Sequence, residues 1–281
     1  MNKKLKLILG AIIIGNTFFV GLFVGKSNIL FKDSNGETAI LESIVDPMSI
    51  DLTDSSIRGL YDLYSKNDSL INILNNSNYI PEKLLKLAYT NPETIEFVSN
   101  YTNKVDNVNT SIDNDYVAGE IPLFLQWDER WGYSNYGNSP MAINGCAPTT
   151  LAMAIVGLTG DTSITPQVIA NYSMDNNYYV DGIGTSWELI SSGANYFGIN
   201  SKHIHISEQS IISTLKKGNP IIISVKPGLF TTTGHFLMIT ALNEDGTVKI
   251  NDPNSAINSS MNWDINILLK EIKGMWEISK S

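Results

Sequence analysis

Residues 144–156 read Asn-Gly-Cys-Ala-Pro-Thr-Thr-Leu-Ala-Met-Ala-Ile-Val. From Leu151 to the end of this stretch every residue is apolar, which is typical of a helix that is buried on all sides. Pro148 suits the first turn of such a helix, and Gly145 allows the chain a tight approach before it. The stretch therefore predicts a buried central helix with Cys146 at its N-terminus.

Cys146 is the only cysteine in the chain, so an intramolecular disulfide is excluded. At a helix N-terminus, unpaired N–H groups and the helix dipole favour a thiolate over a thiol, as a nucleophile requires. The alternative role is that of a small buried hydrophobe, because most free cysteines behave in this way. This stretch alone leaves both interpretations open.

A thiolate nucleophile needs a proton acceptor, and the chain has three histidines. His235 follows Gly234 and opens an apolar strand, where it can face a cleft while a sheet holds it in place. A hydrogen-bonded histidine at a strand end is the alternative. His203 and His205 alternate with isoleucines, which is typical of a solvated strand face. No Asp, Glu or Cys ligand lies at helpful spacing and HExxH is absent, so we expect no zinc site.

A hairpin near the C-terminus supplies a third group. Strands are predicted at residues 221–225, 235–242 and 247–251, and Asn243-Glu244-Asp245-Gly246 turns the last two into an antiparallel hairpin. The far ends of such strands meet, which places Asp252 opposite His235. A carboxylate there can orient the imidazole and stabilise its protonated form. On its own, Asp before Pro is only a common turn starter.

Helical patterns precede these strands in residues 116–281. Thr165-Pro166 marks one helix start, residues 186–197 predict a second helix ended by Gly198, and Ser207 caps a third that runs to residue 217. Helices followed by an antiparallel sheet indicate the α+β class.

The preceding region, residues 27–115, predicts a small helical spacer that ends in a polar linker. Asp54 and Asp68 suit helix caps, and Pro81 and Pro92 suit first-turn positions. An inhibitory pro-segment is the alternative role for this region.

The N-terminal 26 residues predict a membrane segment. Lys3, Lys4 and Lys6 precede an apolar run over residues 7–25, which is close to the ~17–25 residues of a spanning helix and longer than the ~7–15 of a signal peptide's apolar region. We expect a signal-anchor helix, with a cleaved signal as the alternative. Because the lysines stay inside, both place the rest of the chain outside the cytoplasm, at the cell membrane or secreted.

The charge of the chain argues against nucleic acid as a partner. The formal net charge is −9, and the only charges within residues 1–26 are lysines, so the remainder is more acidic still. Such a body repels phosphate backbones, and no basic stripe offsets the repulsion.

Four segments in order resemble the papain clan of cysteine peptidases, and more closely the bacterial family related to double-glycine leader peptidases. They are QWDERWG at residues 126–132, GCAPT at 145–149, TGHF at 233–236 and NDPN at 251–254. The resemblance covers residues 121–281. It implies a papain-like fold, with a central N-terminal helix packed on an antiparallel sheet, and amide-bond cleavage without a metal or organic cofactor.

The resemblance also implies roles for particular residues. Cys146, His235 and Asp252 would be nucleophile, base and orienting group, and Gln126 would donate to the oxyanion. Two positions depart from the family pattern. Ala147 stands where the family often has glycine, and Gln126 lies farther before the cysteine than in papain-like enzymes generally. Asn144 is therefore a rival oxyanion donor.

Together these features predict an extracytoplasmic, membrane-anchored cysteine peptidase that acts on peptides or proteins, with cell-wall peptide among the candidates. A catalytically silent peptide- or cell-wall-binding module on the same fold is one alternative, since fold does not fix function. Another amide chemistry, such as transpeptidation or deamidation, is a second.

Overall fold

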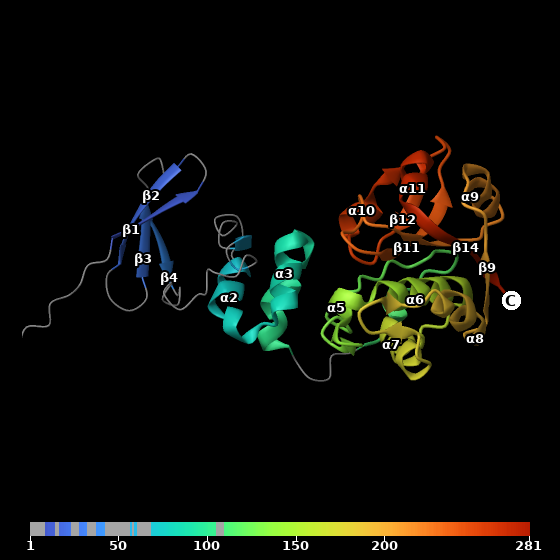
Figure 1. Ribbon diagram of the computed structural model, residues 1–281, viewed down its shortest axis with the longest axis horizontal. Coiled ribbons are helices and arrows are strands. Elements are labelled where there is room, and N and C mark those ends of the chain that lie inside the picture. The colour runs from blue at the N-terminus through green and yellow to red at the C-terminus, as the bar shows by residue number, and fades with distance from the viewer. Residues whose placement is uncertain are drawn as a thin grey trace, which may run out of the picture. The chain divides into compact units, whose positions relative to one another are not determined.

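The computed structural model (Figure 1) describes residues 9–14, 17–23, 28–32, 38–42, 57, 59–60, 69–104 and 110–281. The chain divides into two compact units, Met1–Lys104 and Val105–Ser281. The finer boundaries predicted after residues 26 and 115 stay predictions.

The first unit begins with a four-stranded antiparallel sheet instead of the predicted membrane-spanning helix. Strands β1 (Leu9–Ile14) and β2 (Thr17–Phe23) pair with each other, followed by β3 (Asn28–Lys32) and β4 (Thr38–Glu42). The apolar run contains consecutive isoleucines and phenylalanines, and such β-branched and aromatic residues favour strands over helices. In the part of the chain that the structure describes, no helix has the length and apolar character needed to cross a membrane. The expected location outside the cytoplasm stays a prediction.

Short helices follow within the predicted spacer region. They are α2 (Ser69–Asn75), η3 (Ser77–Tyr79), α3 (Glu82–Thr90), η4 (Pro92–Thr94), α4 (Ile95–Ser99) and η5 (Asn100–Asn103). Pro81 caps α3 and Pro92 opens η4, as their fixed φ angles favour. The helix expected after Asp54 lies largely outside the described residues. Asn72 of α2 donates to the Ser99 carbonyl of α4 over 2.7 Å, which ties these helices together.

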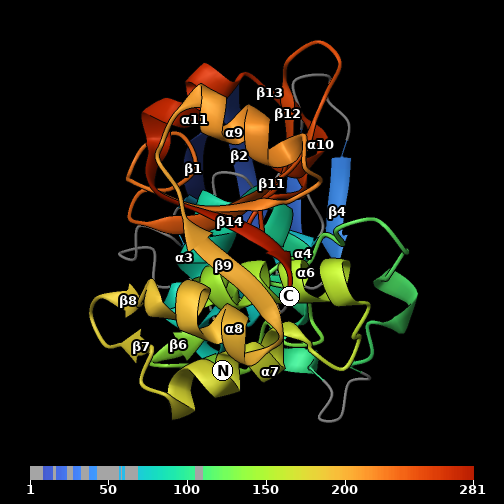
Figure 2. The same cartoon turned by 90° about the vertical axis from the view of Figure 1, so that its right-hand side faces the viewer.

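The second unit is built on a six-stranded antiparallel sheet in the order β13-β12-β11-β10-β14-β9. The strands are β9 (Ile199–His203), β10 (Ile221–Val225), β11 (His235–Leu242), β12 (Val248–Asn251), β13 (Asn262–Trp263) and β14 (Ile272–Lys280). The hairpin predicted between β11 and β12 is present, with Leu242 paired to Val248. Figure 2 shows this sheet from its edge, with β9 and β14 toward the viewer.

Each face of the sheet covers its own apolar core. Alternate side chains point to opposite faces of a strand, and β10 illustrates this. Ile222 joins the core that contains α6 (Cys146–Thr159), whereas Ile221 and Ile223 join the core beneath α9 (Glu208–Leu215) and α11 (Ile265–Glu271). A strand buried on both faces reads as a continuous apolar run, as residues 221–223 do.

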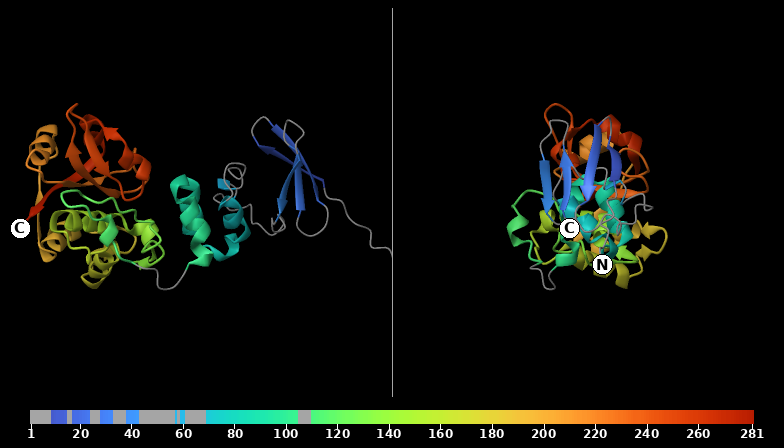
Figure 3. Two further views of the ribbon diagram at one scale, coloured as in Figure 1. Left: turned by 180° about the vertical axis from the view of Figure 1, so that it is seen from behind. Right: turned by 90° about the vertical axis from the view of Figure 1, so that its left-hand side faces the viewer.

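Helix α6 is the centre of the helical layer that packs on one face of the six-stranded sheet. Its residues from Ala147 to Val156 are buried, as predicted, and it ends at Gly160, which adopts the left-handed conformation typical of a helix C-cap. It packs between α7 (Pro166–Asp175) and strand β11, and the Thr150 hydroxyl donates to the Phe236 carbonyl over 3.3 Å. Figure 3 shows α6, α7 and the short helix α8 (Ala194–Tyr196) on one side of the sheet. The α+β class is therefore confirmed.

The sequence-based predictions missed some elements of this unit. Strand β14 was not predicted, although it is the longest strand of this unit and lies between β10 and β9, and of β9 only the His203 end was considered as part of a strand. The helix predicted over residues 186–197 is shorter, consisting of a π-helical turn at Leu189–Gly193 followed by α8. Part of the predicted polar linker also packs into this unit, because Ile112 is fully buried in its core.

Arg130 also holds this part of the predicted linker in place, through Asp115. Its guanidinium forms two hydrogen bonds with the Asp115 carboxylate, at 2.7 and 3.1 Å, and also bonds to Asp128. Burial lowers the pKa of Arg130, but the two carboxylates outweigh it and raise the pKa above its usual value. Asp115, which precedes the region that resembles the peptidase family, is thus anchored to that region by a planar, bidentate ion pair with Arg130.

Candidate active site

Cys146 is the first residue of α6, and the turn before it requires glycine. The short helix α5 (Met141–Asn144) runs directly into Gly145, which caps α6. A Cβ added at Gly145 would lie 2.5 Å from the Met141 carbonyl oxygen, closer than real Cβ atoms come. The glycine therefore lets the chain turn sharply and present a partly exposed Cys146 at the positive end of a buried helix.

His235 and Asp252 form a buried ion pair beside it. His235 opens β11, and Asp252 follows β12, so the hairpin brings them together as predicted from the sequence. The imidazole Nε2 lies 2.7 Å from Asp252 Oδ1, and the side chains are only 6% and 1% exposed. The register of the β11–β12 hairpin thus brings two residues that are 17 positions apart into a hydrogen bond.

The Asp252 carboxylate is held by further donors. Oδ1 also accepts from the backbone N–H of Asn254 at 2.9 Å, and Oδ2 accepts from Asn258 Nδ2 at 2.8 Å. The backbone N–H of Asp252 donates to Ser259 Oγ. A buried carboxylate is tolerated only when its lone pairs are satisfied in this manner.

Electrostatics favours the ionised form of both partners. Burial by itself lowers the pKa of His235, but the Asp252 carboxylate and then Cys146 outweigh it and raise the pKa to about 10. Burial raises the pKa of Asp252, but the His235 imidazolium, Asn258 and the Asn254 N–H together lower it below its ordinary value. At neutral pH the pair is imidazolium and carboxylate.

Cys146 completes the group by reaching the same imidazole. A hydrogen bond and a charge interaction between the Cys146 side chain and His235 both favour the imidazolium. Because Nε2 is committed to Asp252, the remaining ring nitrogen, Nδ1, is the one that faces the sulfur. The three predicted residues therefore lie in a single chain of interactions, from carboxylate to imidazole to sulfur.

Gln126 lies on an extended strap that crosses from the sheet to α5. Asn251 donates to the carbonyls of Ile121 and Pro122, and the Gln126 backbone N–H donates to the Pro253 carbonyl over 2.7 Å. Its side chain is buried, and Nε2 donates to the Ala142 carbonyl at 2.7 Å and lies 3.4 Å from that of Ile143. The amide nitrogen is thus fixed next to the turn before Cys146, with one N–H firmly bonded and the second only weakly.

Asn144 has its amide directed elsewhere. Its Nδ2 donates to the Tyr136 carbonyl and to the Tyr179 hydroxyl, each at 3.1 Å. Both of its N–H groups therefore have protein acceptors. Of the two amides proposed from the sequence, Gln126 retains the freer N–H.

Two contributors to the site were not predicted from the sequence. Tyr179 lies on a hairpin of β7 (Tyr179–Val180) and β8 (Gly184–Thr185), and its ring covers Gly137 so closely that a Cβ there would overlap it. Asn258 reaches Asp252 from α10 (Ala256–Ser260). The signal that could have pointed to Asn258 is the Ser255 cap, since a helix starting there carries residue 258 back toward Asp252.

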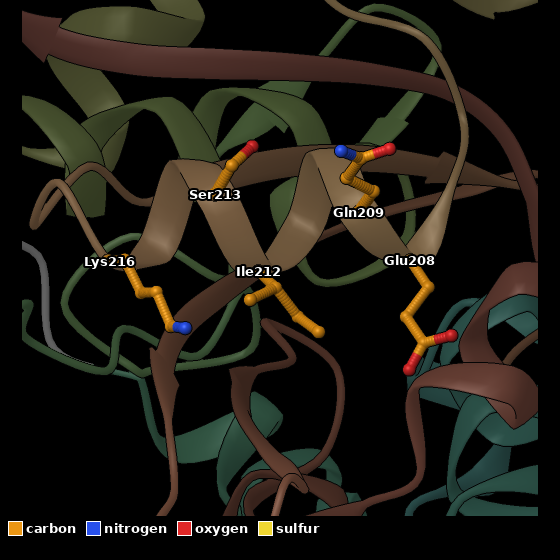
Figure 4. Close-up of a pocket in the computed structure, with 5 residues that line it drawn as sticks. All are labelled: Glu208, Gln209, Ile212, Ser213 and Lys216. Atoms are coloured by element: carbon orange, nitrogen blue, oxygen red, sulfur yellow. The ribbon is translucent and has the colours of Figure 1, made fainter.

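The histidines outside this group stand apart from it. His203 lies on β9, with its ring 5.3 Å from that of Trp276, and His205 is exposed beyond the strand. Within the described residues, no group of three or more His, Cys, Asp or Glu side chains could hold a metal ion. A separate shallow pocket (Figure 4) is lined by side chains of α9 and by Lys216 directly after it, and includes none of the residues predicted for catalysis.

Comparison with known proteins identifies a family for this region. Residues 119–281 match the sequence profile of the Peptidase_C39 like family. No curated protein matches the chain. The matched region contains all four residues predicted for catalysis.

The ion pair predicts a characteristic loss of stability at high pH. His235 has a folded pKa above its unfolded value of about 6.5, so its contribution is complete below pH ~6.5 and disappears as pH rises through about 10. We expect the difference in unfolding free energy between wild type and His235→Gln to shrink over this range, by on the order of 4 kcal/mol. Urea unfolding at a series of pH values measures this difference, in which titrating groups that do not contact His235 cancel. Parallel stability curves for the two proteins would contradict the assignment of the pair.

Proposed function

Because the chain belongs to the Peptidase_C39 like family, whose profile matches more than half of it, we propose that it is an active cysteine peptidase with Cys146 as nucleophile. Membership indicates a cysteine peptidase and hence a peptide or protein substrate. The observation that carries the proposal of activity is the partly exposed Cys146 in contact with a buried His235–Asp252 pair. A cysteine that only filled space would not need an ionised partner beside it.

In the proposed first step, the Cys146 thiolate attacks the carbonyl carbon of a peptide bond. A C–S bond forms, and the carbonyl oxygen takes the electron pair and becomes an oxyanion. The proton on His235 then passes to the leaving amine as the C–N bond breaks, leaving an acyl group on Cys146. Asp252 stays ionised and holds the imidazole in the orientation for this transfer.

In the second step, water replaces the amine. His235, now neutral, accepts a proton from the water, whose oxygen attacks the acyl carbon. The C–S bond breaks, the acid product leaves, and the thiolate–imidazolium pair is restored. No metal or organic cofactor takes part in this sequence.

Two donors are available for the oxyanion in this proposal. The backbone N–H groups in the first turn of a helix lack partners within that helix, and Cys146 is the first residue of α6. The weakly bonded N–H of Gln126 is the second, because its nitrogen is fixed beside the same turn. Donors held in place before the reaction stabilise charge without reorganisation.

We further propose that the chain acts outside the cytoplasm. The support is the sequence: lysines at positions 3, 4 and 6 precede an apolar run, the arrangement of a segment that directs export. The first unit's strands β1 and β2 occupy part of this run.

The thiolate–imidazolium pair predicts rapid alkylation of Cys146 at acidic pH. A free thiol with a pKa near 8.5 is only about 0.3% ionised at pH 6, so its reaction with iodoacetamide is slow there. We expect the full-length wild type to be labelled at pH 6 at least ~10-fold faster than His235→Ala, because the imidazolium stabilises the thiolate. Mass spectrometry measures the label, with Cys146→Ala as the unlabelled control.

The same proteins distinguish an enzyme from a silent binding module. Wild type is expected to cleave members of a mixed peptide library, and Cys146→Ala is expected to fold and bind but not cleave. Equal labelling of wild type and His235→Ala at pH 6, together with no cleavage, would reject the peptidase. A conjugate formed only when an amine is added would indicate transpeptidation.

The oxyanion assignment predicts different outcomes for the two amides. We expect Gln126→Ala to lower kcat about 10²–10³-fold, the usual effect of removing one such donor, while Cys146 alkylation at pH 6 is unchanged. Asn144→Ala is expected to lower kcat less than about 10-fold, since its N–H groups already bond to Tyr136 and Tyr179. The reverse ranking of the two variants would reassign the donor.

The single cysteine provides a test of location. A membrane-impermeant maleimide applied to intact cells that express the chain is expected to label Cys146 as fully as after lysis. A cytoplasmic thiol protein serves as the control for cell integrity, and Cys146→Ala shows the background. Labelling that requires lysis would refute a location outside the cytoplasm.

A further inference from the structure

One of the two oxygens of the Asp252 carboxylate is held by the side chain of Asn258. Oδ1 has two donors, His235 Nε2 and the backbone N–H of Asn254. Oδ2 accepts from Asn258 Nδ2, at 2.8 Å. A carboxylate that is 1% exposed has no bulk water to replace this bond.

Asn258 is itself fixed at both ends of its backbone. Its N–H donates to Ser255 Oγ at 3.0 Å, in the first turn of α10, and its carbonyl accepts from Trp263 Nε1 at 2.9 Å. Charge fixes the orientation of its amide, because the opposite orientation would point an amide oxygen at a carboxylate oxygen. The side chain is therefore aimed at Oδ2 by the α10 turn and by β13.

We propose that Asn258 is a positioning residue that fixes the Asp252 carboxylate in the orientation that binds His235. It acts through Asp252 and touches neither Cys146 nor the imidazole in any contact described above. The importance of this role for catalysis rests on the proposed peptidase function, but the contact itself does not. With Oδ2 held by Asn258, rotation of the carboxylate about its Cβ–Cγ bond would break the hydrogen bonds to His235, Asn254 and Asn258 together.

Within the described part of the chain, few charged groups lie around His235 and Asp252, so an effect of Asn258 on the pKa of Asp252 can be recognised. The titratable groups that act on His235 are Asp252 and, from α6, Cys146; the one that acts on Asp252 is His235. The nearby Lys249 of β12 donates to the Ser260 carbonyl. The other hydrogen-bond partners of the Asp252 carboxylate, Asn254 and Asn258, are uncharged. A hydrogen bond to the charged form of a carboxyl lowers its pKa, and Asn258 contributes in that direction.

A purely structural role for Asn258 is the competing explanation, since it also belongs to the α10 turn. Ser259 provides the matched control. Its hydroxyl accepts from the backbone N–H of Asp252 and contacts the Ser255 carbonyl, so it supports the same turn without touching the carboxylate.

The test is an NMR titration of the Asp252 side-chain carboxyl carbon in the full-length protein. In Asn258→Ala, and in Asn258→Leu, which keeps the shape of the side chain but has no donor, we expect the Asp252 midpoint to rise by about one pH unit. Ser259→Ala is expected to lower the melting temperature without moving that midpoint. If the Asn258 variants lower the melting temperature as Ser259→Ala does but leave the midpoint unmoved, the positioning role is overturned.

Activity separates this proposal from the proposed function. If peptides are cleaved, the acid limb of kcat/KM is expected to move to higher pH in Asn258→Leu and to stay in place in Ser259→Ala. A shifted Asp252 titration in a protein that cleaves nothing would sustain the positioning role and reject the peptidase. An unmoved titration in an active enzyme would do the opposite.

Discussion

The buried contact between His235 and Asp252 sets the conditions that the surrounding structure has to meet. Removing two charges from water costs several kcal/mol for each ion, and only close geometry with further hydrogen bonds offsets that cost. The 2.7 Å separation supplies the first condition, and the donors from Asn254 and Asn258 supply the second. Burial also keeps water away from the proton that His235 and Asp252 share. The charged pair of His235 and Asp252 is buried, while Cys146, which would react, is partly exposed.

The site is assembled where two layers of the second unit meet. The helical layer contributes Cys146, which starts a helix that is buried along most of its length and so is held in place relative to the core. The sheet contributes His235 and Asp252 through adjacent strands of one hairpin. The strap over residues 121–127 joins the layers, because its carbonyls accept from Asn251 while the Gln126 side chain donates to α5. Trp127 adds a bond to the Asn254 carbonyl, so the loop that carries Asp252 is fastened to the strap that carries Gln126. The positions of Gln126 and Asp252 are thereby coupled.

The sequence predicted the features that depend on local chemistry. An apolar run after Gly145 and Pro148 could only be a buried helix, and the turn at residues 243–246 forced His235 and Asp252 together. Strand β14 could not be recognised so easily, because Lys273, Gly274 and Glu277 interrupt its apolar pattern and its place between β10 and β9 is set by tertiary contacts. The N-terminal run shows a related limit, because its hydrophobicity suits a membrane helix while its isoleucines and phenylalanines also favour the strands β1 and β2. The Asn258 contact depends on the angle at which a five-residue helix leaves the loop, which no local pattern encodes.

An aspartate at position 252 has a physical consequence beyond geometry. A neutral amide at position 252 could accept the same hydrogen bond from Nε2, but it would not hold a charge against the imidazolium. With the carboxylate present, the pKa of His235 lies near 10, so the proton remains on the imidazole throughout the physiological range. In the proposed mechanism, the proton needed by the leaving amine is then already in place. The neighbouring uncharged donors keep the carboxylate from taking that proton itself, which is why the amides of the loop and of α10 matter as much to the chemistry as the charged pair.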